Sequence, residues 1–347
     1  MNQPLKALLV GCGSISDLWL GPAKKLPNVE LVGLVDLAEE NAKAQAEKHG
    51  LDVSTGTDLQ SALDALEPDI VFNCTVPAAH FEVTKTSLRR GCHVFSEKPM
   101  ADTMSEAREM LRVAAETGRA FAVMQNRRYD PNIRALASFL QGGVIGDVTT
   151  VDADFYIGAH FGGFREEMAH VLVKDMAIHT FDSARLLTNQ NAKSVYCYEW
   201  NPANSWYERD ASAVAIFEMT GDVVFTYRGS WCAEGLRTPW ESAWRVVGTK
   251  GSVTWDGATG LRCEVVETPE GFIYPYREVE VPELRATEMT AWHGSAVEAF
   301  VGAVRRGETP ETTGADNIRS LAMVYGAVES SEAGRRVAVD LDAKETV

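Results

Sequence analysis

The N-terminal third of the chain alternates short apolar runs with longer stretches of helical periodicity. Residues 70–72, for example, are apolar at consecutive positions, which is typical of strands buried on both faces of a parallel sheet. The alternation predicts β-α-β units and a doubly wound parallel sheet. The expected strands are Ala7–Val10, Leu31–Val35, Ile70–Cys74, His93–Ser96 and Ala120–Met124, and the expected helices are Glu39–His49, His80–Arg90 and Ser105–Thr117.

Beyond Gln125 the pattern changes to segments in which apolar and polar positions alternate. Such alternation indicates antiparallel strands with one buried face, and the glycines at 142, 143 and 146 mark the change. The expected strands are Thr149–Tyr156, Ser194–Trp200, Ala213–Met219, Val223–Gly229, Trp244–Gly248 and Ser252–Trp255, and the expected helices are Asp175–Leu187, Glu288–Arg305 and Ala315–Ala333.

Two domains are therefore predicted. Residues 1–125 are expected to form an α/β Rossmann domain. Residues 126–347 are expected to form an α+β domain with a large, mostly antiparallel open sheet. The C-terminal helix of this second part is expected to be able to pack back on the Rossmann domain.

Composition narrows the class of protein. A net charge of −16, with no run of Lys and Arg, argues against a nucleic-acid partner. The six cysteines lie far apart with no Cys-x-x-Cys pair, which favours reduced thiols in a cytoplasmic protein over disulfides or a zinc site. No apolar stretch reaches the length of a membrane span, and the histidines show no metal-ligand spacing. We therefore expect neither a membrane partner nor a metal.

A glycine-rich turn follows the first strand, with Gly11 and Gly13 in the first two glycine positions of a dinucleotide fingerprint and Ser16 in the third. The first glycine permits the tight turn and the second permits close approach of the pyrophosphate, while Ser14 and Ile15 lead into a helix N-terminus that favours an anion. Asp36 ends the second strand, where an acid bonds the adenosine ribose hydroxyls. Because a carboxylate there repels a 2′-phosphate, the sequence favours NAD over NADP.

Two further motifs carry groups suited to catalysis. The tripeptide Glu97-Lys98-Pro99 ends a predicted parallel strand, at the sheet edge where doubly wound folds place their ligands. Asp175 and His179 lie four residues apart on a predicted helix, so their side chains share one face.

With these motifs the sequence resembles the glucose–fructose oxidoreductase, inositol dehydrogenase and rhizopine-catabolism (Gfo/Idh/MocA) family of oxidoreductases over nearly its whole length. The segment from Thr75 through Pro77 to His80 looks like the family loop that passes over the nicotinamide, and Glu97-Lys98-Pro99 looks like its most characteristic tripeptide. The departure is Ser16 in place of glycine. The resemblance implies that residues 126–347 bind substrate and mediate oligomerisation, and that the protein is a homodimer or homotetramer. The resemblance also assigns further residues to the cofactor site, namely Thr75, Pro77, His80, Glu97, Lys98 and Asn126.

The chemistry follows from what these groups can do. Alcohol oxidation needs a base for the hydroxyl proton while a hydride leaves the same carbon, and a histidine such as His179 is suited to this near neutral pH. A charged Lys98 would stabilise the developing alkoxide. Asp175 can orient His179 or bond a substrate hydroxyl. Which of Lys98 and His179 carries the transferred proton stays open.

The sequence predicts an NAD-dependent dehydrogenase acting on an aldose, a cyclitol or a similar polyol, with either a lactone or a ketone as product. The rival hypotheses are an NADP-linked carbonyl reductase or dihydrodiol-type dehydrogenase, and a non-catalytic dinucleotide sensor. Groups that suit a sugar ring, with its apolar faces and polar edges, are the candidate substrate contacts. They are Arg127, Tyr156, His160, Arg165 and His293.

Overall fold

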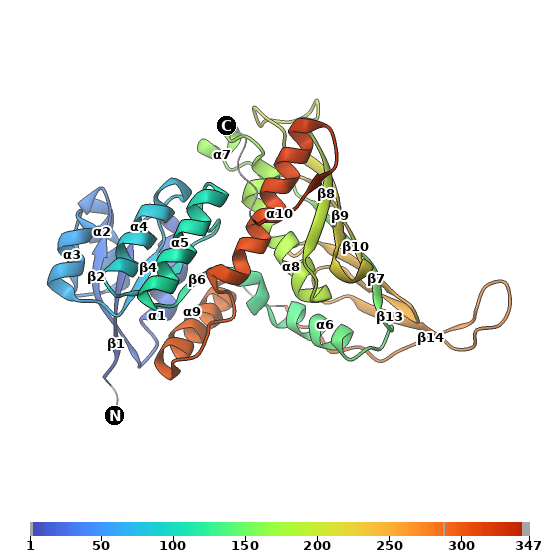
Figure 1. Ribbon diagram of the computed structural model, residues 1–347, viewed down its shortest axis with the longest axis horizontal. Coiled ribbons are helices and arrows are strands. Elements are labelled where there is room, and N and C mark those ends of the chain that lie inside the picture. The colour runs from blue at the N-terminus through green and yellow to red at the C-terminus, as the bar shows by residue number, and fades with distance from the viewer. Residues whose placement is uncertain (1–2, 287–288, 342–347) are drawn as a thin grey trace. The chain divides into compact units, whose positions relative to one another are not determined.

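The computed structural model describes residues 3–286 and 289–341, which divide into two compact units (Figure 1). Residues 3–129 and 289–318 form unit 1, and residues 130–286 and 319–341 form unit 2. The division after Tyr129 lies close to the boundary at 125 that the sequence predicts. The long helix α10 (Gly314–Ala333) begins in unit 1 and continues in unit 2. The assignment of separate tasks to the two parts of the chain stays a prediction.

Unit 1 is built on a six-stranded parallel sheet, which confirms the Rossmann-type fold class. The strand order reverses at β1, because the chain moves outward first to one side and then to the other. In spatial order the strands are β3 (Ser54–Gly56), β2 (Val29–Val35), β1 (Leu5–Val10), β4 (Ile70–Asn73), β5 (His93–Ser96) and β6 (Phe121–Val123).

Helices pack against one another in two groups around this sheet. One group is α1 (Asp17–Ala23), α2 (Glu39–His49) and α9 (Met289–Arg306), and the other is α3 (Leu59–Leu66), α4 (Pro77–Arg89) and α5 (Met104–Thr117). Trp19 is fully buried and its ring lies 4.9 Å from Phe95, which in turn stacks on Phe300 of α9. The C-terminal segment 289–318 therefore completes the core of unit 1.

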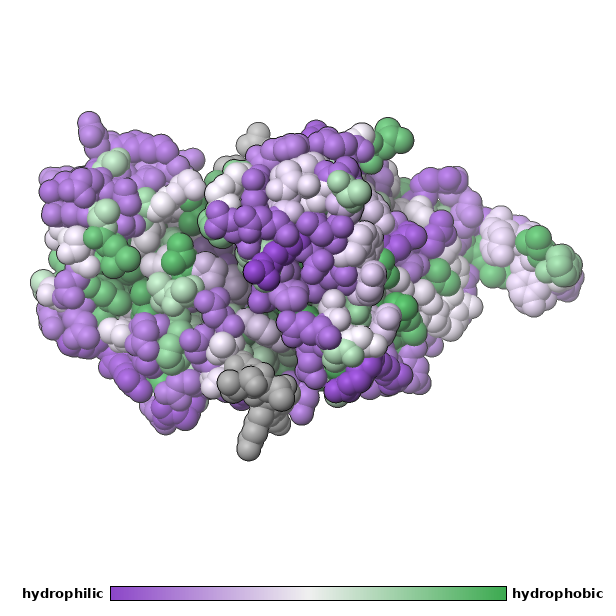
Figure 2. Space-filling model, turned by 90° about the horizontal axis from the view of Figure 1, so that it is seen from above, coloured by the Kyte–Doolittle hydropathy of each residue, from purple (hydrophilic) through white to green (hydrophobic). Residues whose placement is uncertain are grey.

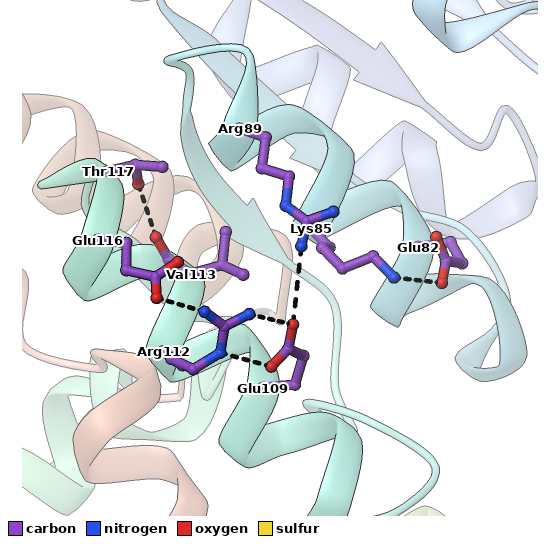
Figure 3. Close-up of polar contacts among 8 residues, drawn as sticks. All are labelled: Glu82, Lys85, Arg89, Glu109, Arg112, Val113, Glu116 and Thr117. Atoms are coloured by element: carbon purple, nitrogen blue, oxygen red, sulfur yellow. Dashed lines mark hydrogen bonds and ion pairs between the residues drawn. The ribbon is translucent and has the colours of Figure 1, made fainter.

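Ion pairs line the exposed surface of α4 and α5 (Figure 3). Arg112 holds Glu109 with two nitrogen–oxygen contacts of 2.6 and 2.7 Å and also pairs with Glu116, while Lys85 lies 2.6 Å from Glu82. Exposed pairs of this kind add little to stability because water screens them. They mark the solvated face of the helices.

Unit 2 contains a nine-stranded, mostly antiparallel sheet, which confirms the predicted sheet type but has three more strands than the six expected. All neighbouring strands are antiparallel except β10 and β7, which are parallel. In spatial order the strands are β14 (Tyr276–Glu278), β13 (Leu261–Val266), β12 (Gly251–Trp255), β11 (Ala243–Gly248), β7 (Val148–Tyr156), β10 (Val224–Ser230), β9 (Ser212–Met219), β8 (Ala192–Trp200) and β15 (Val337–Ala338).

One face of this sheet is covered by helix α8 (Ile178–Thr188), whose Phe181 packs on Phe217, Phe225 and Tyr227. A π-helical turn, Leu172–Ala177, leads directly into α8. The other helices of unit 2 are α6 (Pro131–Gln141), α7 (Phe164–Glu167) and the later part of α10. In the described part of the chain, no helix is long and apolar enough to cross a bilayer.

Candidate functional site

The turn after β1 requires glycine at its first position. Gly11 adopts a φ of 92°, and a Cβ there would lie 2.6 Å from the carbonyl carbon of Cys74. Its amide donates to the carbonyl of Val35 at 2.8 Å, which ties the turn to the neighbouring strand. Any side chain at this position would force β1 and the segment after β4 apart.

Gly13 is a glycine for a different reason. A Cβ there would have no protein atom within 4 Å, so its packing within the protein does not require glycine. The open space fits a residue that a ligand's pyrophosphate approaches closely. Ser16 is fully buried and its Oγ donates to the Gly13 carbonyl at 2.6 Å. The serine thus keeps the third position of the fingerprint small and also secures the turn.

Asp36 holds the opposite side of this turn. Its carboxylate accepts the amide of Cys12 at 2.7 Å, the amide of Ala38 at 3.0 Å and the side-chain amide of Asn41 at 3.0 Å. Burial would raise the pKa of Asp36, but these hydrogen bonds outweigh it and lower the pKa below its ordinary value. The group is therefore a carboxylate at neutral pH. Leu37, the next residue, is 97% exposed and offers no cationic group for a 2′-phosphate.

Glu97 is a buried carboxylate at the end of β5. Its Oε1 accepts the indole N–H of Trp19 at 2.7 Å and lies 3.8 Å from His293 Nε2, while its Oε2 accepts the amide of Lys98 at 3.1 Å. Burial would raise the pKa of Glu97, but His293, Trp19 and the Lys98 charge lower it below its usual value. This carboxylate therefore anchors the peptide that carries Lys98.

The segment after β6 is also buried. Asn126 lies 3.5 Å from His293, Arg127 lies 5.9 Å over the ring of Trp292, and Arg128 pairs with Asp316 at 2.8 Å. Unit 1 thus brings together Glu97, Asn126 and His293, although the sequence separates them widely. The segment lies beside the end of β5 because the amide of Met124 donates to the carbonyl of Ser96.

Asp175 and His179 lie in unit 2, on the π-helical turn and on the first turn of α8 respectively. Asp175 Oδ2 is 3.0 Å from Arg165 Nε, and the Arg165 guanidinium lies 5.1 Å from the ring centroid of Phe161 and 4.9 Å from that of Phe164. His179 is buried. The predicted substrate residue Arg165 is therefore a direct partner of the predicted catalytic residue Asp175.

A second ion pair holds the segment just before the π-helical turn. His170 has a φ of 56°, and its Nδ1 lies 2.8 Å from the buried Glu199 on β8. The hydrogen bond to Glu199 raises the pKa of His170 above its ordinary value, although burial opposes this. The pair therefore connects the segment that precedes Asp175 to strand β8 of the sheet.

Two other predicted substrate residues, His160 and Tyr156, also belong to unit 2. His160 is exposed, stacks on Trp206 with 3.7 Å between ring centroids, and lies 2.9 Å from Glu234. Tyr156 follows Phe155 on β7, and alternation places it on the sheet face opposite the one that α8 covers. Arg165, in contrast, forms an ion pair with Asp175 of the Asp175–His179 segment.

Some residues around the candidate site could not be predicted from the sequence. Trp19, His170 and Phe161 are single residues outside any motif, and their partners are 78, 29 and 70 positions away. Only the folded chain brings such pairs together. The predicted catalytic residues themselves divide between the units, with Lys98 in unit 1 and Asp175 and His179 in unit 2.

Comparison with protein families matches both parts of the chain. Residues 5–125 match the family described as oxidoreductase family, NAD-binding Rossmann fold, and residues 133–254 match the GFO/IDH/MocA C-terminal domain. The two matches together cover most of the chain and follow the same order as the two predicted domains.

Individual relatives agree with these matches. The chain is 25% identical over 344 residues to inositol 2-dehydrogenase of Rhizobium meliloti, covering 95% of this chain and 98% of that protein. It is 33% identical over 189 residues to D-glucoside 3-dehydrogenase of Escherichia coli, covering 53% and 54%. An Agrobacterium radiobacter oxidoreductase, solved with NAD+, L-tartaric acid and magnesium, has the same fold, with a TM-score of 0.86, 20% identity and coverage of 97% and 99%.

Proposed function

Because this chain belongs to the Gfo/Idh/MocA family of NAD(P)-dependent oxidoreductases, we propose that it oxidises one hydroxyl of an aldose, a cyclitol or a similar polyol, with NAD as the acceptor. The observation that carries the proposal is the set of Lys98, Asp175 and His179 in a chain that also has the Gly11–Asp36 dinucleotide turn. Inositol and a D-glucoside are the substrates in the names of two relatives, and both are cyclic polyhydroxylated molecules.

The cofactor would be held by groups at the carboxyl edge of the unit 1 sheet. Gly13 would face the pyrophosphate, Asp36 would accept hydrogen bonds from the adenosine ribose, and Thr75 and Asn126 would border the nicotinamide. When bound, the nicotinamide ring takes up the hydride that leaves the substrate carbon. The surroundings of Asp36 support NAD, because its carboxylate is ionised and Leu37 beside it brings no positive charge.

Replacing Asp36 with Asn is expected to shift cofactor preference toward NADP by about tenfold or more. Asn keeps the shape of the side chain but removes the charge that repels a 2′-phosphate, and a hydrogen bond to a charged group contributes roughly 1.5–3 kcal/mol. The measurement is kcat/KM with NAD and with NADP. Asp58→Asn is the matched control, because Asp58 caps α3 by accepting the amide of Ser61. A wild-type enzyme that prefers NADP would contradict the assignment of Asp36.

Different side chains would stabilise the charge on the substrate oxygen, accept the proton and position the substrate. Lys98 would donate to the substrate oxygen and stabilise negative charge as it develops there. His179 would accept the hydroxyl proton. Asp175 is held by Arg165 at 3.0 Å, so this ion pair would set the position of the carboxylate at the substrate. Arg165 is in turn the first candidate for a hydrogen bond to a second substrate hydroxyl, with His160, Arg127 and His293 as further candidates.

The first test is to follow NADH formation with a panel of aldoses, cyclitols and acyclic polyols. Turnover of one class with NAD supports the proposal and identifies the substrate, and analysis of the product distinguishes a lactone from a ketone. Turnover only in the reducing direction with NADPH would instead favour a carbonyl reductase. Dinucleotide binding by calorimetry without any turnover across the panel would favour a sensor.

The outer face of the unit 2 sheet also supports a homo-oligomer. Tyr196 and Tyr198 on β8 are 43% and 59% exposed, and Ile216 on β9 and Val224 on β10 lie on the same face. Further apolar side chains, among them Phe272, are exposed at the tip of the hairpin between β13 and β14, at the right-hand end of Figure 2. Apolar groups collected on one sheet face usually mark an interface. We propose that a second copy of the chain covers this face.

Light scattering is expected to give the mass of a dimer or tetramer for the wild type and a smaller species for Ile216→Asp. A carboxylate at this position would be buried without a partner in the assembly. Leu236→Asp is the control, because Leu236 is fully exposed and lies outside the sheet strands. A monomeric wild type would contradict the proposal.

A further inference from the structure

His80 lies in the first turn of α4, and its side chain is 0% exposed. Both ring nitrogens contact backbone carbonyl oxygens of unit 1. Nδ1 lies 2.7 Å from the oxygen of Pro99, and Nε2 lies 2.9 Å from the oxygen of Thr75. The two carbonyls belong to different loops, one after β5 and the other after β4. The imidazole therefore bridges the two loops.

The two contacts fix the orientation of the ring. A carbonyl oxygen accepts hydrogen bonds and never donates them, so a ring nitrogen bonds to it only through an N–H. Each tautomer of the neutral ring therefore hydrogen-bonds to the carbonyl of one loop and packs its other nitrogen against the carbonyl of the second loop. Turning the ring over would place carbon atoms against both carbonyls.

The bridge adds to the pairing of β4 and β5, which ends where the amide of Glu97 donates to the carbonyl of Asn73 at 2.8 Å. The loop after β4 is held by Asn73, whose Oδ1 accepts the Thr75 hydroxyl at 2.7 Å and whose amide donates to the Thr84 hydroxyl at 3.1 Å. The loop after β5 is held by Glu97, which accepts the amide of Lys98. His80 contacts both loops directly, at the carbonyl oxygen of Pro99 in one and that of Thr75 in the other.

We propose that His80 is a positioning residue that holds the Lys98–Pro99 segment at a set distance from the Thr75 loop. The inference rests on the proposed function, because it assigns Lys98 to the substrate and Thr75 to the nicotinamide. The resemblance placed His80 itself among the cofactor-binding residues. A fully buried ring whose nitrogens both meet carbonyls acts on the cofactor only through the two loops.

The positioning role is tested with His80→Phe and His80→Gln. Phe keeps a ring but donates to neither carbonyl, whereas the Gln amide can donate to one of them. We expect kcat of His80→Phe to fall by roughly 10–100-fold, since small misplacements of a reacting group have effects of that order. His80→Gln should recover part of the loss, and the Kd of NAD should change by less than about threefold in both, because the contacts to the adenosine half and the pyrophosphate are intact.

Ser87→Ala is the matched control, because Ser87 is also buried on α4 but bonds only to the Val83 carbonyl of its own helix. A His80→Phe enzyme with the kcat of this control would overturn the inference, as would a loss of NAD affinity that matches the loss of kcat. Should His80→Phe fail to fold, His80→Gln carries the test. If the wild-type enzyme oxidises no polyol, both the proposed function and the positioning role are overturned. If the wild type is active and His80→Phe is equally active, only the positioning role of His80 is overturned.

Discussion

Replacing Lys98 with Met is expected to lower kcat by about a thousandfold while the Kd of NAD stays nearly unchanged. Met retains most of the length and apolar volume of Lys but removes the positive charge. The charge matters most as the hydroxyl becomes an alkoxide, so the loss falls on the transition state and not on binding of the ground state. Steady-state kinetics give kcat, and calorimetry gives the affinity for NAD.

The matched control is Lys43→Met. Lys43 is on the surface of α2, where it pairs with Glu39 one turn away at 3.0 Å. The same chemical change there should leave kcat within about twofold, because an exposed pair of this kind contributes little. A Lys98→Met enzyme that retains more than about a tenth of the wild-type kcat would remove Lys98 from the chemical step.

Replacing His179 with Asn is expected to reduce kcat/KM by about 10²–10⁴-fold, the usual range for loss of a general base. It should also remove the rise of kcat/KM with pH that reports deprotonation of that base in the free enzyme. The pH dependence separates this role from a purely structural one, because a packing defect would lower the whole profile and leave its shape intact. The measurement is therefore a full profile of kcat/KM against pH.

Thr188→Ala serves as the control for damage to the helix. Thr188 ends α8, and its hydroxyl bonds to the Ala184 carbonyl within the same helix. This change should leave the pH profile unaltered. If His179→Asn keeps the ascending limb of the profile, the base is another group, and Lys98 becomes the first candidate for the proton.

The buried parallel strands of unit 1 could be predicted because continuous apolar runs have few alternatives. His93–Ser96 agrees exactly in its bounds with β5, and Ile70–Cys74 is one residue longer than β4. The helix after the glycine turn is expected, but the bounds of α1 are not predicted, because Gly21 and Pro22 lie within its seven residues and both are poor helix formers. The three-residue strand β3 and the short α3 have too few positions for a period to be recognised.

In unit 2 the alternation predicts which segments are strands but not how they pair. The parallel pairing of β10 with β7 depends on how the chain crosses the sheet, and no residue pattern in either strand encodes it. The helix carrying His179 is predicted as one piece from Asp175. In the structure it begins earlier, with a π-helical turn at Leu172, because apolar positions alone do not distinguish the two kinds of helix.

By itself, the sequence determined the fold class and the residues with catalytic potential. Hydrophobic periodicity and short motifs are both properties of residues that are close together along the chain, so they can be recognised without the fold. Gly11, Asp36 and Lys98 all stand out at this level. Only the tertiary structure decided which partners these residues have. Trp19 and His293 surround Glu97, Arg165 holds Asp175, and His80 joins two loops, since each of these contacts requires segments distant in the chain to meet in a buried site where every polar group needs a partner.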